Sequence, residues 1–174
     1  MPRRYHRRRS YAIARPLRKY SNETYIINLI KPGSATIAAG DQLLGVYSPK
    51  ASTLGTRKIK NFTLSLSSNN NVPFVYALVY VPEGTQPSTL KLNPQTITSD
   101  AIDAISLYEP NQNVIMSGMF GGPSGQIIKA KTRLARNLNS NDFIVLIIAP
   151  VQNFAIEQGD SFCCCCALNF AITY

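Results

Sequence analysis

The sequence predicts an all-β fold, an antiparallel sandwich or barrel, preceded by a basic segment outside the folded part. Its apolar segments are short, many of them alternate with period two, and helical periodicity is almost absent. Clusters of Gly, Pro, Asn and Ser separate these segments. A chain of 174 residues suggests one domain, which is large enough to bury a core without disulfides or a metal.

The first twenty residues form the basic arm, which contains eight basic side chains and no acid before Glu23. Such a run repels itself and buries little apolar surface, so we expect it to be disordered. Arginine suits phosphate because its planar fork meets two oxygens at once. Tyr5, Tyr11 and Tyr20 offer rings on which unstacked bases can lie, which favours single-stranded partners. The predicted nucleic-acid contacts in the arm are Arg3, Arg4, Arg7, Arg8, Arg9, Arg15, Arg18 and Lys19.

The charge is concentrated in this arm. The whole chain carries a net charge of +9 from 18 basic and 9 acidic residues, and without the arm 10 basic residues face 9 acidic ones. A nearly neutral body with one cationic segment is typical of a polyanion binder. An arm that serves only as a nuclear-import signal, or a merely solvated tail, is the alternative. We therefore expect an arm over residues 1–20 and one folded domain over 21–174.

Two further basic clusters lie in the body. Arg57, Lys58 and Lys60 are predicted nucleic-acid contacts that extend the cationic surface if they face the same side as the arm. Lys129, Lys131 and Arg133 share one face of a predicted strand. That face is either solvated, a secondary phosphate contact or an interface between subunits.

The pattern predicts individual elements. We expect strands over residues 23–30, 56–67, 73–81, 113–120, 126–133, 143–149 and 162–174, and a loop with one short strand over 35–46. Residues 68–71 resemble a hairpin connection, and 137–142 have turn chemistry. The long segment between 85 and 112 contains three prolines, and we expect a short helix near 99–105. A loop of this length is usually functional or interfacial.

Side-chain alternation also predicts which faces are buried. The strands over 73–81 and 143–149 are apolar on both faces, so both faces should be covered. Asn61 interrupts the alternation of its strand and predicts a β-bulge. In the last strand Phe162, Cys164, Cys166, Leu168, Phe170 and Ile172 fall on one face.

An enzyme is not expected. The single histidine, His6, lies in the arm, which leaves the body without a histidine for a catalytic triad or a zinc cluster. The nine acids form no close pair in sequence, and the stretch from Gly118 to Gly125 lacks the lysine of a phosphate loop. We predict no cofactor and no metal site.

The four cysteines are consecutive, from Cys163 to Cys166. Neighbouring strand residues point to opposite faces, so these cysteines cannot form a disulfide framework, which indicates a reducing compartment, cytosol or nucleus. Packing as small hydrophobic side chains is the favoured interpretation, with a redox or metal role as the alternative. Neither a secretory signal nor a run long enough to span a bilayer is visible, so no membrane insertion is expected.

Several motifs resemble one family. Three stretches are similar to capsid proteins of small circular single-stranded DNA viruses: Leu107 to Gln112 (LYEPNQ), Arg133 to Asp142 (RLARNLNSND) and Tyr80 to Thr85 (YVPEGT). The first two are each followed by an apolar strand. These are the circovirus-like and nanovirus-like proteins. The basic arm stands where the family's arm stands. The chain departs from the family pattern at Ala135, where Ser is typical, and at Asn141, where Gly is typical, and the cysteine run is not a family feature.

The resemblance implies a single eight-stranded antiparallel jelly roll, of which about 60 copies close into an icosahedral shell. The arm would face inward onto a packaged single-stranded DNA genome and would also engage the host nuclear-import machinery. The chain would then occur in the virion and in the host nucleus, and would meet an unidentified cell-surface receptor. The alternatives are the capsid subunit of a small RNA satellite-type virus, and a cellular single-strand-binding β-barrel with Tyr76 and Tyr80 as candidate stacking rings.

Overall fold

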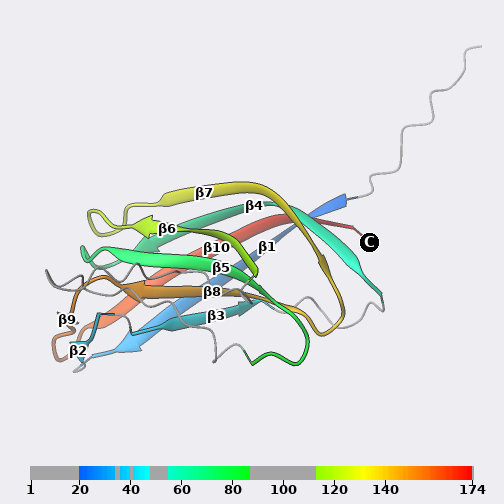
Figure 1. The fold of residues 1–174 in the computed structure, drawn as a ribbon. Coiled ribbons are helices and arrows are strands. Elements are labelled where there is room, and N and C mark those ends of the chain that lie inside the picture. Colours follow the sequence, from blue (N-terminus) through cyan, green and yellow to red (C-terminus); the bar gives the residue numbers. More distant parts are fainter. Residues whose placement is uncertain (1–19, 34–35, 40, 48–54, 87–112, 174) are drawn as a thin grey trace, which may run out of the picture.

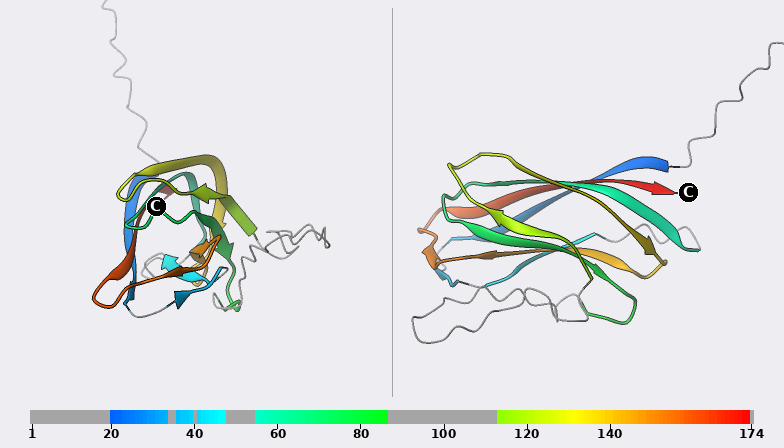
Figure 2. Two further views of the ribbon diagram at one scale, coloured as in Figure 1. Left: turned by 90° about the vertical axis from the view of Figure 1, so that its left-hand side faces the viewer. Right: turned by 45° about the horizontal axis from the view of Figure 1, so that its top comes forward.

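The computed structural model describes residues 20–33, 36–39, 41–47, 55–86 and 113–173. Two four-stranded antiparallel sheets pack face to face, with the strand orders β1-β10-β4-β7 and β3-β8-β5-β6 (Figures 1 and 2). A two-residue pair, β2 with β9, lies at one end. The strands are β1 (Tyr20–Pro32), β2 (Thr36–Ile37), β3 (Leu43–Tyr47), β4 (Arg57–Ser68), β5 (Phe74–Val81), β6 (Asn113–Phe120), β7 (Ile128–Leu138), β8 (Phe143–Pro150), β9 (Phe154–Ala155) and β10 (Ser161–Thr173).

This connectivity is that of a jelly roll, which confirms the predicted fold class. Among the eight long strands, only β5 and β6 are consecutive in the chain and adjacent in one sheet; every other step crosses between the sheets. The predicted hairpin over residues 68–71 is therefore wrong. Turn residues do follow β4, but β4 and β5 belong to different sheets, because the chain uses this turn to change layers.

The main core fills the space between the sheets. Phe74 is fully buried in this core, with ring centroids 5.1 Å from Phe162 and 5.3 Å from Phe120. Phe62 and Leu64 of β4 are fully buried in the same cluster. The predicted inward face of the last strand is confirmed, because all six of its residues belong to this cluster.

A second apolar cluster lies on the other face of the β3-β8-β5-β6 sheet. Val79 and Val81 of β5 pack there with Val145 and Ile147 of β8, and all four are buried. Both faces of these two strands are thus covered, as their continuous apolar runs predicted.

The strand bounds differ from the predictions at several places. β1 spans Tyr20–Pro32 and so includes the last residue of the predicted arm. β7 continues to Leu138, five residues beyond the predicted end, so the turn that follows is shorter than residues 137–142. The segment 35–46 contributes β3, a full member of one sheet. At Asn61 the bulge is confirmed: its φ is 58°, and the pairing of β4 with β7 shifts between Lys60 and Phe62. Asn tolerates this left-handed conformation better than most residues. The predicted helix over 99–105 lies outside the described residues.

Candidate nucleic-acid interface

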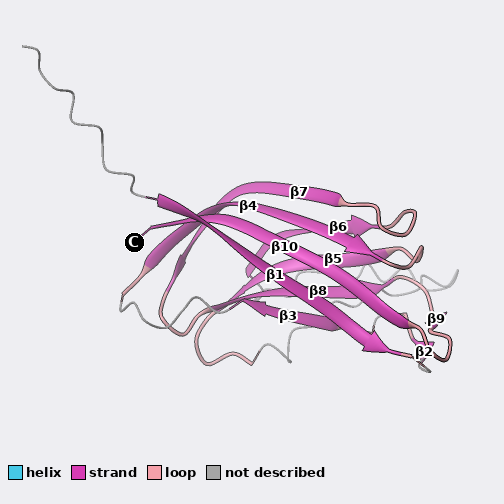
Figure 3. Cartoon of the chain, turned by 180° about the vertical axis from the view of Figure 1, so that it is seen from behind, coloured by secondary structure: helices cyan, strands magenta, loops and turns pink. Residues whose placement is uncertain are grey.

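The outward side of the β1-β10-β4-β7 sheet carries the body's basic clusters. β1 and β10 lie side by side there, with β4 next to β10 and β7 at the far edge (Figure 3). Along these four strands, the outward positions that the structure describes hold five basic side chains and no acid. We call this surface the cationic face; its basic residues are Lys58, Lys60, Lys129, Lys131 and Arg133.

The three basic residues of β7 share this face, as their period-two spacing predicted. Lys129, Lys131 and Arg133 are all exposed. Lys131 lies opposite Thr63 and Lys129 opposite Ser65 of β4, so no bulky neighbour covers them in the sheet.

The predicted cluster on β4 is divided. Lys58 and Lys60 lie on either side of the fully buried Ile59 in the strand and so point outward. Arg57 is two residues from Ile59 and so lies on the inward face of β4. The ammonium of Lys60 lies 3.7 Å from the ring centroid of Tyr20. A cation over an aromatic ring is stabilised by the ring's electron-rich face. Two of the three predicted residues therefore belong to the cationic face.

Tyr20 is the first described residue, and it pairs with Thr173 at the end of β10. The backbone N–H of Lys58 donates to Oγ1 of the same Thr173 at 2.9 Å. The point where the arm meets the body is thus held beside the basic end of β4, close to the C-terminus (Figures 1 and 3). The eight predicted contacts in the arm itself lie outside the described residues.

A polar hollow of about 580 Å³ crosses all four strands on this face. Amide and hydroxyl side chains of β1, β10 and β4 form its floor, and two lysines of β7 form one side. The hydroxyl of Thr24 on β1 donates to Oδ1 of Asn169 on the neighbouring strand β10. The hollow is lined by Asn22, Thr24, Asn61, Thr63, Ser65, Lys129, Lys131, Asn169 and Phe170. Lysines beside neutral donors and acceptors can hold phosphate and sugar oxygens without reading bases.

Sequence reasoning missed the polar floor of this hollow. Asn22 and Thr24 come from β1, whereas Asn169 lies about 145 positions later. The only local signal was that the alternation of each strand places these residues on its outward face, and every exposed strand residue shares that property. The pairing of the first strand with the last is what brings them to the lysines.

The two described motifs that carry the family resemblance meet at Asp142. This residue is almost fully buried, at 1% exposure. Its carboxylate accepts hydrogen bonds from the Tyr80 hydroxyl at 2.6 Å, the Glu83 N–H at 3.0 Å and the Asn139 N–H at 2.6 Å. The Asn141 amide in turn donates to the Glu83 carboxylate at 2.6 Å. The turn before β8 is therefore tied to the end of β5.

These contacts shift both pKa values. Burial would raise the pKa of Asp142, but the hydrogen bonds from Tyr80, Asn139 and Glu83 outweigh it and lower that pKa. Burial, and then the hydrogen bond and charge of Asp142, raise the pKa of Tyr80 to about 12. Tyr80 is thus engaged, and Tyr76 is 6% exposed in the core, so neither ring is free to stack on a base.

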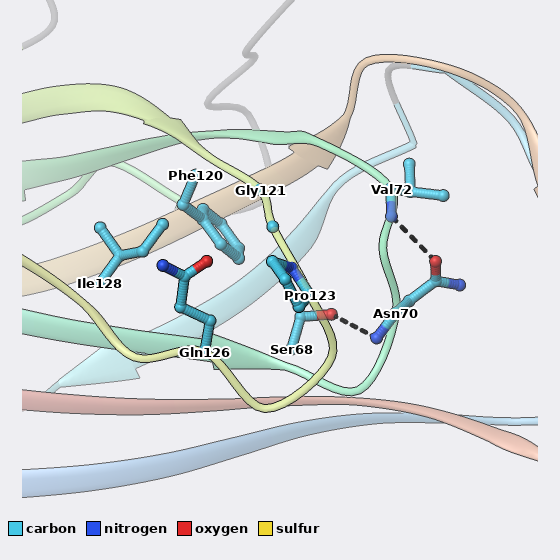
Figure 4. A pocket seen from close by; sticks show the side chains of 9 residues that line it. Ser68, Asn70, Val72, Phe120, Gly121, Pro123, Gln126 and Ile128 are labelled. Carbon is cyan, nitrogen blue, oxygen red and sulfur yellow. Dashed lines mark hydrogen bonds between the residues drawn. The ribbon is translucent and has the colours of Figure 1, made fainter.

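The glycine-rich stretch connects β6 to β7 and behaves as a structural loop. Its residues pack on the turn after β4, where the Asn70 N–H donates to Ser68 Oγ at 3.0 Å and the Val72 N–H to Asn70 Oδ1 at 2.9 Å (Figure 4). The space enclosed there is only about 10 Å³. That is enough for about one water molecule, so a phosphate group does not fit.

A substitution at Gly121 tests how closely this loop packs against Pro73. A Cβ on Gly121 would lie 2.9 Å from Cα of Pro73, so the backbone must shift. We expect Gly121→Ala to lower the free energy of unfolding by about 1–3 kcal/mol, measured by urea denaturation. Ser124→Ala in the same exposed loop is the control, and equal losses in both variants would contradict this close approach.

Within the described part of the chain, no helix has the length and apolar character needed to cross a membrane. The described residues also contain no group of three or more His, Cys, Asp or Glu side chains that could hold a metal ion. Comparison with known proteins finds no family model and no curated protein that matches the chain.

Proposed function

We propose that the chain is a self-assembling shell subunit that binds single-stranded nucleic acid through its basic arm and cationic face. The observation that carries this proposal is the position of Tyr20, where the arm meets the body at the basic end of an acid-free sheet face. Phosphates held by the arm would pass directly onto the lysines of β4 and β7. Binding of this kind is electrostatic and largely blind to sequence.

The difference between the two sheets supports a shell wall. One sheet presents a polar, cationic outer face, and the other packs a second apolar cluster on its outer side. In such a wall the cationic face would meet the cargo, and the sheet with the second apolar cluster would lie on the other side. A body with nearly balanced charge allows many copies to lie side by side without strong mutual repulsion.

The resemblance given above favours a particular shell, the icosahedral capsid of a small circular single-stranded DNA virus with about 60 copies. About 60 arms with eight charges each supply roughly 480 positive charges, which neutralise several hundred phosphates. The arm would then also serve nuclear import. The engaged rings of Tyr76 and Tyr80 weigh against the cellular single-strand-binding alternative, which depends on free stacking surfaces.

Assembly of the purified chain is the first test. We expect closed particles by electron microscopy and fast sedimentation at high protein concentration, with contents that a DNA-specific nuclease degrades once particles are opened. A monomer that persists at all salt concentrations contradicts the shell. Contents degraded only by a ribonuclease would favour the RNA satellite-type alternative.

Deletion of residues 1–19 separates the arm from the wall. We expect the truncated chain to fold and to lose most of its nucleic acid, because about eight phosphate contacts disappear and each steepens the salt dependence of binding. The ratio of absorbance at 260 and 280 nm and circular dichroism measure the two effects. Equal nucleic-acid content with and without the arm would remove the arm from the proposal.

A further inference from the structure

The cysteine run divides into two pairs of thiols on opposite faces of β10. Cys164 and Cys166 point into the main core, with their sulfur atoms 3.7 Å apart. Cys163 and Cys165 point outward, with their sulfur atoms 3.9 Å apart, and Cys165 is exposed. The strand thus displays an outer dithiol at its surface and keeps an equivalent pair buried.

The backbone is held in place at both cysteines of the outer dithiol. The Cys163 N–H donates to Oδ1 of Asn69 at 2.8 Å, and the Asn69 N–H donates to the Cys163 carbonyl at 3.1 Å. Cys165 is paired with Asn28 on one side and Ser67 on the other, in the middle of the sheet. The two sulfur atoms therefore approach each other on a rigid frame, which is what a preorganised ligand pair requires.

The hollow beside the outer dithiol is largely apolar and is lined by no charged side chain. Ile26 and Ile30 of β1 are 72% and 62% exposed, and Ile127 is 64% exposed. A hollow of about 140 Å³ beside Cys165 is lined by Ile26, Ile127, Ala167 and parts of β4. No carboxylate lines it, so hard cations such as Ca²⁺ and Mg²⁺, which need oxygen ligands, find no site.

We propose that Cys163 and Cys165 form a binding site for one soft, thiophilic metal ion of the Cu(I) class. Two bonds of about 2.3 Å to sulfur atoms 3.9 Å apart meet at a metal with an angle of about 115°. Cys165 is exposed, so the ion can reach its sulfur atom from solvent. On binding, the two S–H protons leave for solvent, two metal–sulfur bonds form, and the metal keeps its oxidation state.

The number of ligands selects the ion. Structural zinc takes four protein ligands, and the described residues offer no group of three or more metal-ligating side chains. Thiolates select soft ions such as Cu(I) as well as zinc and iron–sulfur clusters, and a pair of thiolates without further protein ligands suits Cu(I). The remaining coordination position of Cu(I) is open to solvent or to a small thiol.

Competition for Cu(I) tests the proposal. The reduced full-length chain is titrated under anaerobic conditions against a chromogenic Cu(I) chelator, and Zn²⁺ is tested in parallel. We expect one Cu(I) per chain and weaker Zn²⁺ binding. The variant Cys163→Ser/Cys165→Ser should bind Cu(I) at least about 100-fold more weakly, because the second thiolate acts at high effective concentration. All variants keep the same N-terminal residues, so any binding by the arm cancels in the comparison.

Single variants decide between a chelate and separate thiols. Cys163→Ala and Cys165→Ala alter side chains on the surface of the sheet, so the fold should survive, and each should lose most of the affinity. Cys164→Ala/Cys166→Ala, checked by circular dichroism, should retain it. X-ray absorption of the loaded chain should show two sulfur neighbours. Wild-type affinity in either single variant would overturn the proposal. So would wild-type affinity in Cys163→Ser/Cys165→Ser, or one metal per two chains.

Discussion

Replacing Asp142 with alanine is expected to lower the free energy of unfolding by about 3–4 kcal/mol. The substitution leaves the Tyr80 hydroxyl and the N–H groups of Glu83 and Asn139 without their acceptor. The Asp142 side chain that they contact is only 1% exposed. These hydrogen bonds are part-buried, so each donor that loses its partner costs part of the about 1–3 kcal/mol that a fully buried donor would cost. Urea or guanidinium denaturation at pH 7 measures the loss.

The matched control for this prediction is Asp160→Ala. Asp160 is an exposed turn residue whose described hydrogen bond is made by its backbone N–H to Glu157. We expect a change within about 0.5 kcal/mol there. Tyr80→Phe, which removes only one donor, should cost less than Asp142→Ala. Equal small losses in Asp142→Ala and Asp160→Ala would show that the carboxylate does not hold the two motifs together.

The same carboxylate makes the fold sensitive to acid. The pKa of Asp142 is lower in the folded chain than its ordinary value of about 3.9, so its contribution to stability is present above that value and is lost as the pH falls through the folded pKa. The difference in stability between wild type and Asp142→Asn should therefore be constant near neutrality and shrink below about pH 4. A constant difference down to pH 2.5 would contradict a depressed pKa.

Reversing two charges on the cationic face is expected to weaken single-stranded nucleic-acid binding by about 10- to 100-fold near 0.1 M salt. Lys129→Glu/Lys131→Glu removes two cations from one wall of the polar hollow and places two anions there. The slope of log affinity against log salt should fall by about 0.7 for each phosphate that the variant no longer neutralises. Fluorescence anisotropy with a labelled oligonucleotide at several salt concentrations measures both quantities on the full chain.

One pair of variants distinguishes the effect of a lysine's position on the sheet from the effect of the chain's total charge on binding. Lys131→Glu and Lys31→Glu change the net charge equally, but Lys31 pairs with Phe162 at the other end of β1, far along the strand from the polar hollow. We expect the larger loss for Lys131→Glu. Equal losses would indicate that only total charge matters, and an unchanged affinity in Lys131→Glu would leave binding to the arm alone.

Much of the fold could be predicted from local patterns. Period-two alternation found the inward face of β10 and the shared face of Lys129 and Lys131 because each depends only on residues two apart. The bulge was visible for the same reason, since Asn61 breaks the alternation between Ile59 and Phe62. Buried strands were visible as continuous apolar runs.

The rest depends on pairing between distant segments, which no local pattern reports. The turn after β4 contains the residues of a hairpin, yet nothing in those residues says that the chain moves to the other sheet. β3 was underestimated because it has five residues and contains Gly45. Asp142 looked like ordinary turn chemistry, and only the structure shows Tyr80 and Glu83 approaching it from about 60 positions away.

The pairing of β1 with β10 also has a consequence for biosynthesis. β10 is the only sheet neighbour of β1 among the described strands, and it is the last of them to leave the ribosome. Until then the exposed Ile26 and Ile30 stand on a strand with open hydrogen-bonding groups on both edges. This sheet can therefore be completed only after β10 has been synthesised, and we expect folding on the order of milliseconds to seconds, as for other folds rich in distant contacts. A nascent chain arrested before residue 161 would be a substrate for holding chaperones.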